Sequence, residues 1–138
     1  MRNQAKFVPD KKKRKKRKNI SQKELYRRLY KIYRVLQSDK CGVVFERLRG
    51  AWGEYEPSAN NGLNAIKINP HRREFFNTII HECLHAINYN MPHYKVYWLA
   101  GQIVKKMSSA QYAHLVIALT RGLEKYYSLK VKKEIKKS

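Results

Sequence analysis

The sequence predicts an α+β protein, because helical and strand-like hydrophobic patterns occupy different parts of the chain. Apolar residues recur at helical spacing over 25–36 and again over 75–126, whereas short strand-like runs fill 42–68 between them. The 138 residues, of which 43% are hydrophobic, suffice for one domain with a buried core. We therefore expect an N-terminal helix, a small three-stranded antiparallel sheet, a central helix and two further helices.

The first helix is expected to run from Ser21 to about Ser38. Ser21 and Glu24 have the spacing of a capping box, and Ile20 can pack on Leu25 at the start of the helix. Four aliphatic residues then recur at steps of three and four, which predicts a buried stripe made of Leu25, Leu29, Ile32 and Leu36.

Three short runs of β-branched, aromatic and other apolar residues predict the sheet. They cover residues 42–45, 51–55 and 63–68, and they are separated by Gly50 and by a cluster of turn-forming residues at 57–62. Because these strands would follow one another through turns, we expect them to pair as an antiparallel sheet.

Helical periodicity returns after Pro70 and continues toward the end of the chain. A helix is expected from about residue 72 to 89, where Asn90 and Pro92 would end it. A second helix is expected over 93–106. A third begins at the Ser108-to-Gln111 capping box and carries a packing seam made of Tyr112, Val116, Leu119, Leu123 and Tyr126.

The formal net charge of +21 belongs mainly to the two ends of the sequence. Ten of the 31 Lys and Arg residues lie in 1–19, eight of them consecutively from Lys11 to Lys18, and five more lie in 130–138. The eight consecutive charges from Lys11 to Lys18 repel one another and include nothing apolar to bury, and the segment at 130–138 is strongly basic as well. We therefore expect disordered basic tails at 1–19 and 130–138, flanking a folded domain at 20–129.

Several classes of protein are disfavoured by composition. The basic N-terminal run is not followed by an apolar stretch, so a secretory signal is not expected, and no stretch is long and apolar enough to cross a membrane. The two cysteines, Cys41 and Cys83, form neither a disulfide framework nor a CxxC pair. These features favour an intracellular protein without a membrane partner.

The pattern most informative about chemistry is His81-Glu82-Cys83-Leu84-His85, an HExxH motif in the predicted central helix. His81 and His85 are four residues apart and therefore lie on one helix face, where both imidazoles can bind one metal ion. Glu82 is rotated about 100° from His81 and can instead reach a water molecule at the metal. Cys83 and Leu84 would face the core. The motif thus supplies two ligands and one base.

A catalytic zinc ion usually has three protein ligands, so a further ligand is needed. His93 is the best candidate, because it follows His85 by eight residues and the turn at 90–92 would bring the chain back toward the motif. His114 and His71 remain rivals for this position.

The motif and its surroundings resemble the SprT-like zinc metalloprotease domain of the zincin group. The resemblance covers about residues 20–107, and the matching residues are His81, Glu82, His85 and His93, with an aromatic-rich helix at 94–99 after them. It implies a zincin-like fold with zinc as cofactor and His81, His85 and His93 as ligands. It also implies that the domain at 20–129 cleaves proteins.

The expected mechanism is that of a zinc endopeptidase. Zinc would polarise the scissile carbonyl and activate water, and Glu82 would act as the general base that later protonates the leaving amine. An extended protein substrate could pair with the strand at 51–55 or with the one at 63–68. The candidates for an additional oxyanion donor are Tyr94, Tyr97 and His114.

The basic run from Lys11 to Lys18 predicts a partner and a location. Such a run binds phosphates of DNA or RNA with little sequence preference, or serves as a nuclear localisation signal if the host is eukaryotic. Together with the resemblance, it suggests protein cleavage near or on nucleic acid. The competing hypothesis is a non-catalytic nucleic-acid-binding protein in which the zinc site is structural.

Overall fold

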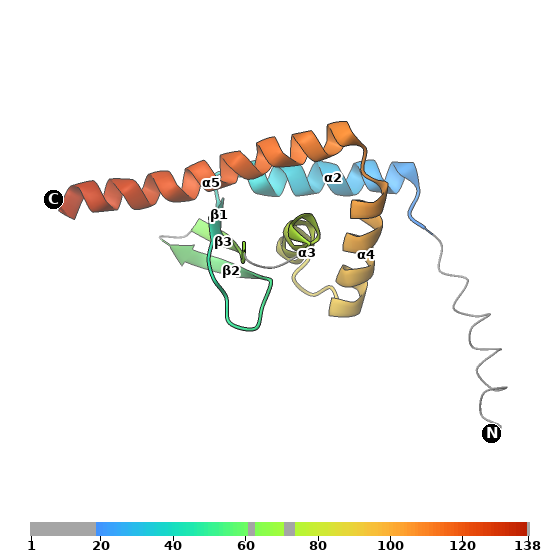
Figure 1. Cartoon of the computed structure of the whole chain (residues 1–138), viewed down its shortest axis with the longest axis horizontal. Helices are drawn as coiled ribbons and strands as arrows, with labels where there is room; N and C mark the ends of the chain where they lie inside the picture. Colours follow the sequence, from blue (N-terminus) through green and yellow to red (C-terminus); the bar gives the residue numbers. More distant parts are fainter. Residues whose placement is uncertain (1–18, 61–62, 71–73, 138) are drawn as a thin grey trace, which may run out of the picture.

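The computed structural model describes residues 19–60, 63–70 and 74–137, which form an α+β fold of four helices and a three-stranded sheet (Figure 1). The run from Lys11 to Lys18 and the histidine His71 lie outside the described residues. The helices are α2 (Gln22–Gln37), α3 (Phe75–Ile87), α4 (His93–Lys106) and α5 (Ser109–Lys137). The strands are β1 (Cys41–Phe45), β2 (Gly53–Asn60) and β3 (Leu63–Ile68).

Helix α2 forms where its capping signal and apolar stripe predict it. The Ser21 hydroxyl accepts a hydrogen bond from the backbone N–H of Glu24 at 3.1 Å. The Glu24 carboxylate, however, pairs with Arg27 and Arg28 and does not reach back to the cap. The four aliphatic residues of the stripe are all buried in the main core, as is Ile20 before the helix.

The sheet is mixed, and the expectation of a wholly antiparallel sheet was wrong. The strand order is β1-β3-β2, with β1 parallel to β3 and β2 antiparallel to it. The segment between β1 and β2 carries the chain past the position of β3. Strands β2 and β3 then form a hairpin, and β3 lies between β2 and β1. Strand order depends on this non-local crossing, and hydrophobic patterns do not encode it.

Strand β2 is longer than the predicted run at 51–55. It starts at Gly53 and continues to Asn60, through residues predicted to form a turn. Pro57 has no N–H for the ladder, and the pairing of β2 with β3 shifts register between Glu56 and Asn60. Because β2 lies at the edge of the sheet, a proline and a bulge are tolerated there.

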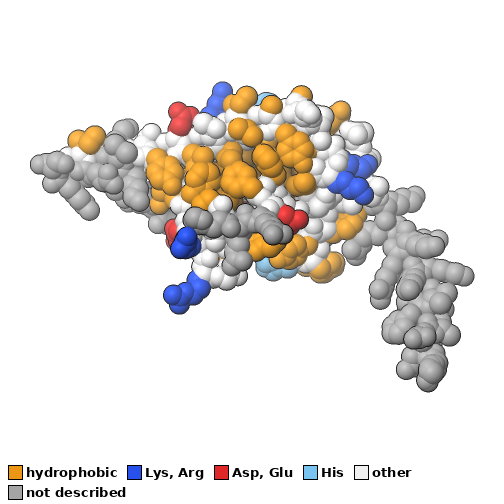
Figure 2. Space-filling model, in the orientation of Figure 1, with side chains coloured by type: hydrophobic (Ala, Val, Ile, Leu, Met, Phe, Trp, Pro, Cys, Tyr) orange, Lys and Arg blue, Asp and Glu red, His pale blue; other side chains and the backbone are white. Residues whose placement is uncertain are grey.

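Helix α3 is fixed at its first turn by aromatic contacts. Phe75 packs on Phe45 of β1 with ring centroids 6.0 Å apart, and Phe76 packs edge-on against Tyr112 of α5 at 5.1 Å. Hydrophobic side chains gather on this face of the molecule, below α5 in the view of Figure 2. Helix α3 therefore lies between the sheet and the other helices, and this placement fixes the direction of the HExxH side chains.

Helix α5 differs from its prediction at its end. Its start is confirmed, because Ser108 and Gln111 bond reciprocally through backbone N–H groups and side-chain oxygens at 2.8 and 3.2 Å. The helix then continues to Lys137, through the segment predicted to be a disordered tail, and extends beyond the sheet (Figure 1). After Gly122 the sequence holds no glycine or proline, and Lys, Leu and Glu favour helix. None of the described helices has the length and hydropathy needed to cross a membrane.

Candidate metal centre

The two histidines of the HExxH motif lie in mid-helix α3 and point to one position. The Nε2 atoms of His81 and His85 are 3.1 Å apart. Two nitrogen ligands at the usual zinc distance and the tetrahedral angle would be about 3.3 Å apart. The spacing of four residues on a helix thus produces the ligand pair that the sequence predicted.

The third imidazole comes from the first residue of α4. The turn between α3 and α4 is tied by a hydrogen bond from the Met91 N–H to the Asn88 carbonyl, and Pro92 then starts α4. His93 consequently lies 4.8 Å from His85 and 5.9 Å from His81 between ring centroids. One ligand atom from each of the three histidines lies within 4.8 Å of the others. The structure therefore brings together all three predicted ligands.

The rival histidine His114 lies elsewhere. Its ring stacks on Tyr33 of α2 with a centroid distance of 4.3 Å, and the Tyr33 hydroxyl bonds to the Gln111 carbonyl. Among the described residues, the cluster able to hold a metal ion consists of His81, His85 and His93 only.

The environment of His81 and His85 favours neutral imidazoles. His81 is only 8% exposed, and this burial lowers its pKa to about 4, with a further contribution from repulsion by His85 and His93. The pKa of His85 is also lowered, first by burial and then by His93. Neutral imidazole is the form that binds metals, so these shifts leave the ring nitrogens available at neutral pH. Three converging imidazoles fit a divalent metal ion.

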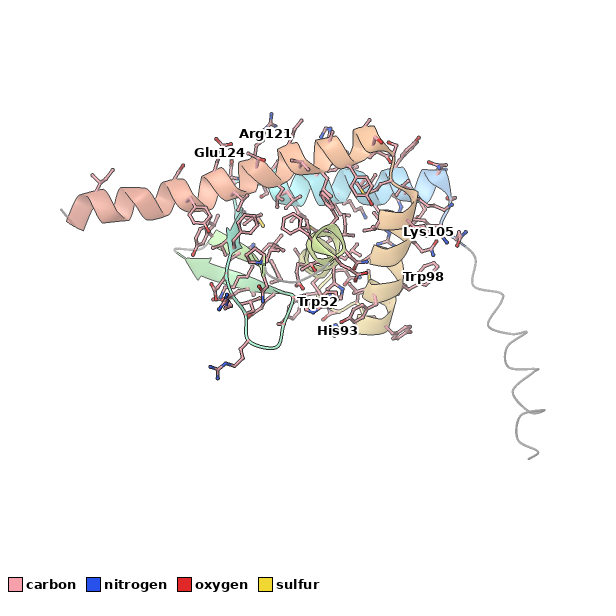
Figure 3. The ribbon with its side chains drawn as sticks, in the orientation of Figure 1. Trp52, His93, Trp98, Lys105, Arg121 and Glu124 are labelled. Carbon is pink, nitrogen blue, oxygen red and sulfur yellow. The ribbon has the colours of Figure 1, made fainter. Side chains whose placement is uncertain are left out.

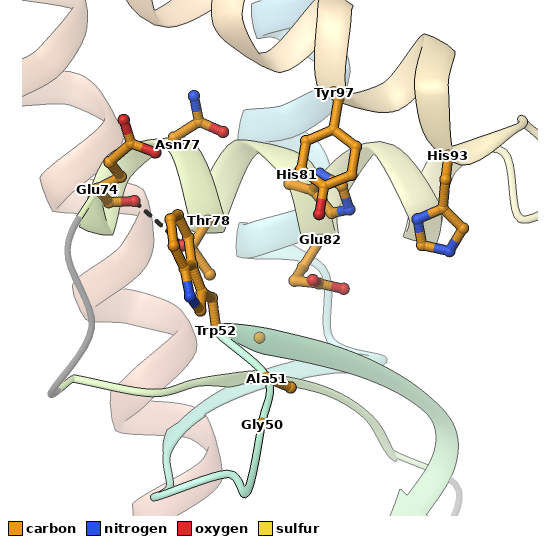
Figure 4. Close-up of a pocket in the computed structure, with 11 residues that line it drawn as sticks. Gly50, Ala51, Trp52, Glu74, Asn77, Thr78, His81, Glu82, His93 and Tyr97 are labelled. Carbon is orange, nitrogen blue, oxygen red and sulfur yellow. Dashed lines mark hydrogen bonds between the residues drawn. The ribbon is translucent and has the colours of Figure 1, made fainter.

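The Glu82 side chain extends from α3 toward β2, below His81 in the view of Figure 4. Its side chain is 7% exposed, and burial raises its pKa to about 7, with a smaller contribution from the carboxylate of Glu54 on β2. A Cβ added to Gly53 would lie 2.7 Å from Thr78 Cγ2 and 2.9 Å from Glu82 Cγ. The absence of a side chain at Gly53 thus lets β2 approach Glu82 closely.

The cluster opens into a pocket of about 420 Å³ between α3, α4 and the segment that precedes β2. This segment is held by Asn69, whose side-chain amide donates to the carbonyls of Leu48 and Ala51 at 3.1 and 3.2 Å. Trp52 forms one wall, and the pocket lies on the opposite side of the molecule from Arg121 and Glu124 of α5 (Figure 3). The described lining residues are Gly50, Ala51, Trp52, Gly53, Glu74, Asn77, Thr78, His81, Glu82, His93 and Tyr97.

Of the three candidate oxyanion donors, one lines this pocket. The Tyr97 ring lies edge-on to His81 at 4.7 Å and its hydroxyl points into the pocket (Figure 4). Tyr94 and His114 are not among the described lining residues.

Sequence reasoning missed the contribution of the strand side of the pocket. Trp52 and Glu54 were assigned only to a strand, although one is a wall and the other acts on the pKa of the Glu82 carboxyl. A glycine between them, Gly53, was an available signal, because glycine inside a strand often marks a close approach of another element.

Comparison of the chain with protein-family models, with curated proteins and with solved structures found no match. What defines the class of this protein is therefore its own geometry: an α+β fold with a cluster of three histidines that can bind a metal ion.

Proposed function

We propose that the protein is a zinc-dependent metallopeptidase of the SprT-like, zincin-like type, which cleaves proteins near or on nucleic acid. The observation that carries this proposal is a cluster of three converging imidazoles, two of which, from His81 and His93, line one open pocket together with the buried carboxylate of Glu82. The imidazoles of His81, His85 and His93 would hold the metal, and the carboxylate of Glu82 would act as the base.

An open pocket favours the enzyme over the alternative of a structural zinc site. Structural zinc sites are closed and usually have four protein ligands. Here the described residues offer three, and His93 is exposed at the edge of the pocket. A ligand position facing the pocket is what a catalytic site requires.

The proposed chemistry divides between the metal and Glu82. Zinc, when bound, would supply a Lewis acid for the substrate carbonyl and would activate water. Glu82 would accept a proton from the attacking water and donate it to the leaving amine nitrogen. Burial raises its pKa to about 7, while a neighbouring cation would favour the ionised form that can accept the proton.

The sheet topology limits where an extended substrate could bind. Strand β3 pairs with β1 on one side and β2 on the other, so it offers no edge, and β1 packs against α5. Strand β2 is the edge strand that reaches the pocket at Gly53. Of the two strands left open by the sequence, the one that includes Gly53 is therefore the better candidate for pairing with a peptide.

The decisive variant is Glu82→Gln, tested by cleavage of an unstructured fluorogenic peptide with zinc-loaded protein. The amide keeps the size of the side chain but cannot take a proton, so cleavage should fall by about 100-fold or more while zinc binding is retained. Zinc content is measured in parallel by elemental analysis, and His81→Ala should lose the metal.

The matched control is Glu124→Gln, a change of the same kind on the exposed side of α5, which should cleave like the wild type. Wild-type cleavage by Glu82→Gln would refute the enzyme and favour the non-catalytic nucleic-acid-binding alternative. A wild-type zinc content well below one equivalent, unchanged in His81→Ala, would refute the metal site itself.

A further inference from the structure

One side of helix α2 is exposed to solvent, and packing in the core does not explain which residues lie there. The residues on this side are cations interleaved with two tyrosines, and both tyrosine side chains are largely exposed, at 60% for Tyr26 and 62% for Tyr30. We call this surface the α2 basic face; its residues are Lys23, Tyr26, Arg27, Tyr30, Lys31 and Arg34, all exposed.

We propose that the α2 basic face binds single-stranded nucleic acid, with its cations on the phosphates and its two tyrosines stacked on bases. The proposal goes beyond the proposed hydrolase function, because neither the histidine cluster nor Glu82 takes part in it. It also differs from binding by the basic run that ends at Lys18, since it assigns a site to the folded domain.

The charge of this face is largely uncompensated. Within the described part of the chain, Lys23, Lys31 and Arg34 make no ion pair, while Arg27 pairs with Glu24 at 2.6 Å. An ordinary solvated helix face usually alternates acids and bases, which pair with one another. Free cations on a helix instead complement the phosphates of a polyanion.

The tyrosines favour a single strand over a duplex. Tyr26 and Tyr30 are one helical turn apart, a rise of about 6 Å, whereas stacked bases in a duplex strand rise by about 3.4 Å. Each ring can therefore meet its own base only where the bases are unstacked. The Arg34 guanidinium carbon lies 5.6 Å from the Tyr30 ring centre, which extends this platform with a cation–π contact.

The apolar side of α2 argues against a membrane or a partner helix as the occupant. Its aliphatic residues are committed to the core, where Leu25 and Leu29 are buried together with Ile32 and Leu36. A helix that inserts into a membrane surface needs a free apolar face, and a helical partner needs aliphatic residues at its seam. The α2 basic face offers neither.

The basic run precedes α2 directly in the sequence, and this also supports a nucleic acid as the ligand. Three residues separate Lys18 from Gln22, the first residue of α2. Because a run of like charges favours a polyanion as partner, this part of the sequence agrees with a nucleic acid as the ligand of the α2 basic face.

The test uses the full chain and fluorescence anisotropy with a labelled single-stranded oligothymidylate and a duplex of the same length. Loss of the rings in Tyr26→Ala/Tyr30→Ala should weaken single-strand binding at least tenfold, with little effect on the duplex. Measurement at raised salt reduces the contribution of the phosphate contacts and makes the loss easier to see. Phe at both positions preserves stacking and should bind like the wild type.

The control is Tyr89→Ala, which removes an equally exposed tyrosine, 70% accessible, at the end of α3, and should bind like the wild type. Changing Lys31 and Arg34 to Gln should reduce the slope of log K against log salt by roughly 1.4 on the single strand. Unchanged single-strand affinity of the double alanine variant would overturn the proposal. Equal losses on single strand and duplex would also overturn it, because the rings would then not be reading unstacked bases.

Discussion

Helices α2 and α3 pack in the same core but bury different kinds of residue. Helix α2 buries one aliphatic stripe and leaves its other side to solvent, so folding alone accounts for its apolar residues. Helix α3 buries seven consecutive residues, from Thr78 to Leu84, and two of them are His81 and Glu82. Burying such polar groups costs free energy that an aliphatic residue would not. The proposed function accounts for this difference, because it uses His81 and Glu82 for chemistry and not for stability.

Because of this difference, a substitution in α2 and a substitution in α3 test different properties of the protein. On the exposed side of α2 a change leaves the core untouched, so binding is measured on an intact fold. In α3 the site and the core share residues, so stability has to be measured beside activity. The predictions below test this difference, beginning with the largest expected effect.

Substitutions on the two sides of α2 should differ sharply in their effect on stability. Leu29 is 2% exposed, and Leu29→Ala should lower the free energy of unfolding by about 2–5 kcal/mol, because it removes apolar contacts and leaves a cavity. One residue further along, Tyr30→Ala should change it by no more than about 0.5 kcal/mol. Urea unfolding followed by circular dichroism measures both; similar losses in the two variants would mean that α2 does not divide into a buried and an exposed side.

Local patterns in the sequence were enough to predict the helices, apart from the end of α5, and to predict that His81 and His85 lie together. Helix α4 was expected over 93–106 and is found there, and the spacing of His81 and His85 determines their relation on any helix. The position of His93 near the motif could also be predicted, because a turn of a few residues leaves the chain little freedom.

What the sequence did not reveal depends on contacts between distant segments. The mixed sheet requires the chain to cross between β1 and β2, and the approach of Glu54 to Glu82 requires β2 to lie against α3. The helical end of α5 was missed for another reason: the high lysine content of 130–138 was taken to indicate a disordered tail, although the helix propensity of lysine and the lack of glycine or proline allow a helix.

The contact between β2 and α3 can be tested at Gly53. A methyl group there would lie 2.7 Å from Thr78 Cγ2 and 2.9 Å from Glu82 Cγ, so Gly53→Ala must displace either β2 or these two side chains of α3. We expect a loss of about 1–3 kcal/mol in unfolding free energy, together with a lower rate of peptide cleavage.

The matched change is Gly101→Ala in mid-helix α4, where an added Cβ meets nothing within 4 Å. Alanine favours helix over glycine, so this variant should gain about 0.5–1 kcal/mol and cleave normally. If Gly53→Ala were as stable and active as Gly101→Ala, the close approach of β2 to Glu82 would be wrong.

The carboxylate in α3 should carry a pH-dependent cost in stability, which is measured with the metal removed by a chelator. Burial raises the pKa of Glu82 from 4.5 to about 7, so between these values the folded protein holds a proton that the unfolded chain releases. The stability due to the neutral carboxyl is complete below about pH 4.5 and is lost as the pH rises through 7. Since glutamine carries no charge, Glu82→Gln should raise the melting temperature more at about pH 8 than at about pH 5.

Thermal unfolding of the wild type and Glu82→Gln at the two pH values measures this difference, with Glu124→Gln as the exposed control that should show none. A gain from Glu82→Gln that is equal at both pH values would show that the Glu82 carboxyl does not titrate in this range. Zinc restored to the protein should shrink the gain at the higher pH, because a cation held by His81, His85 and His93 stabilises the neighbouring carboxylate. The pH dependence would then link the charge of the base to occupancy of the metal centre without any measurement of cleavage.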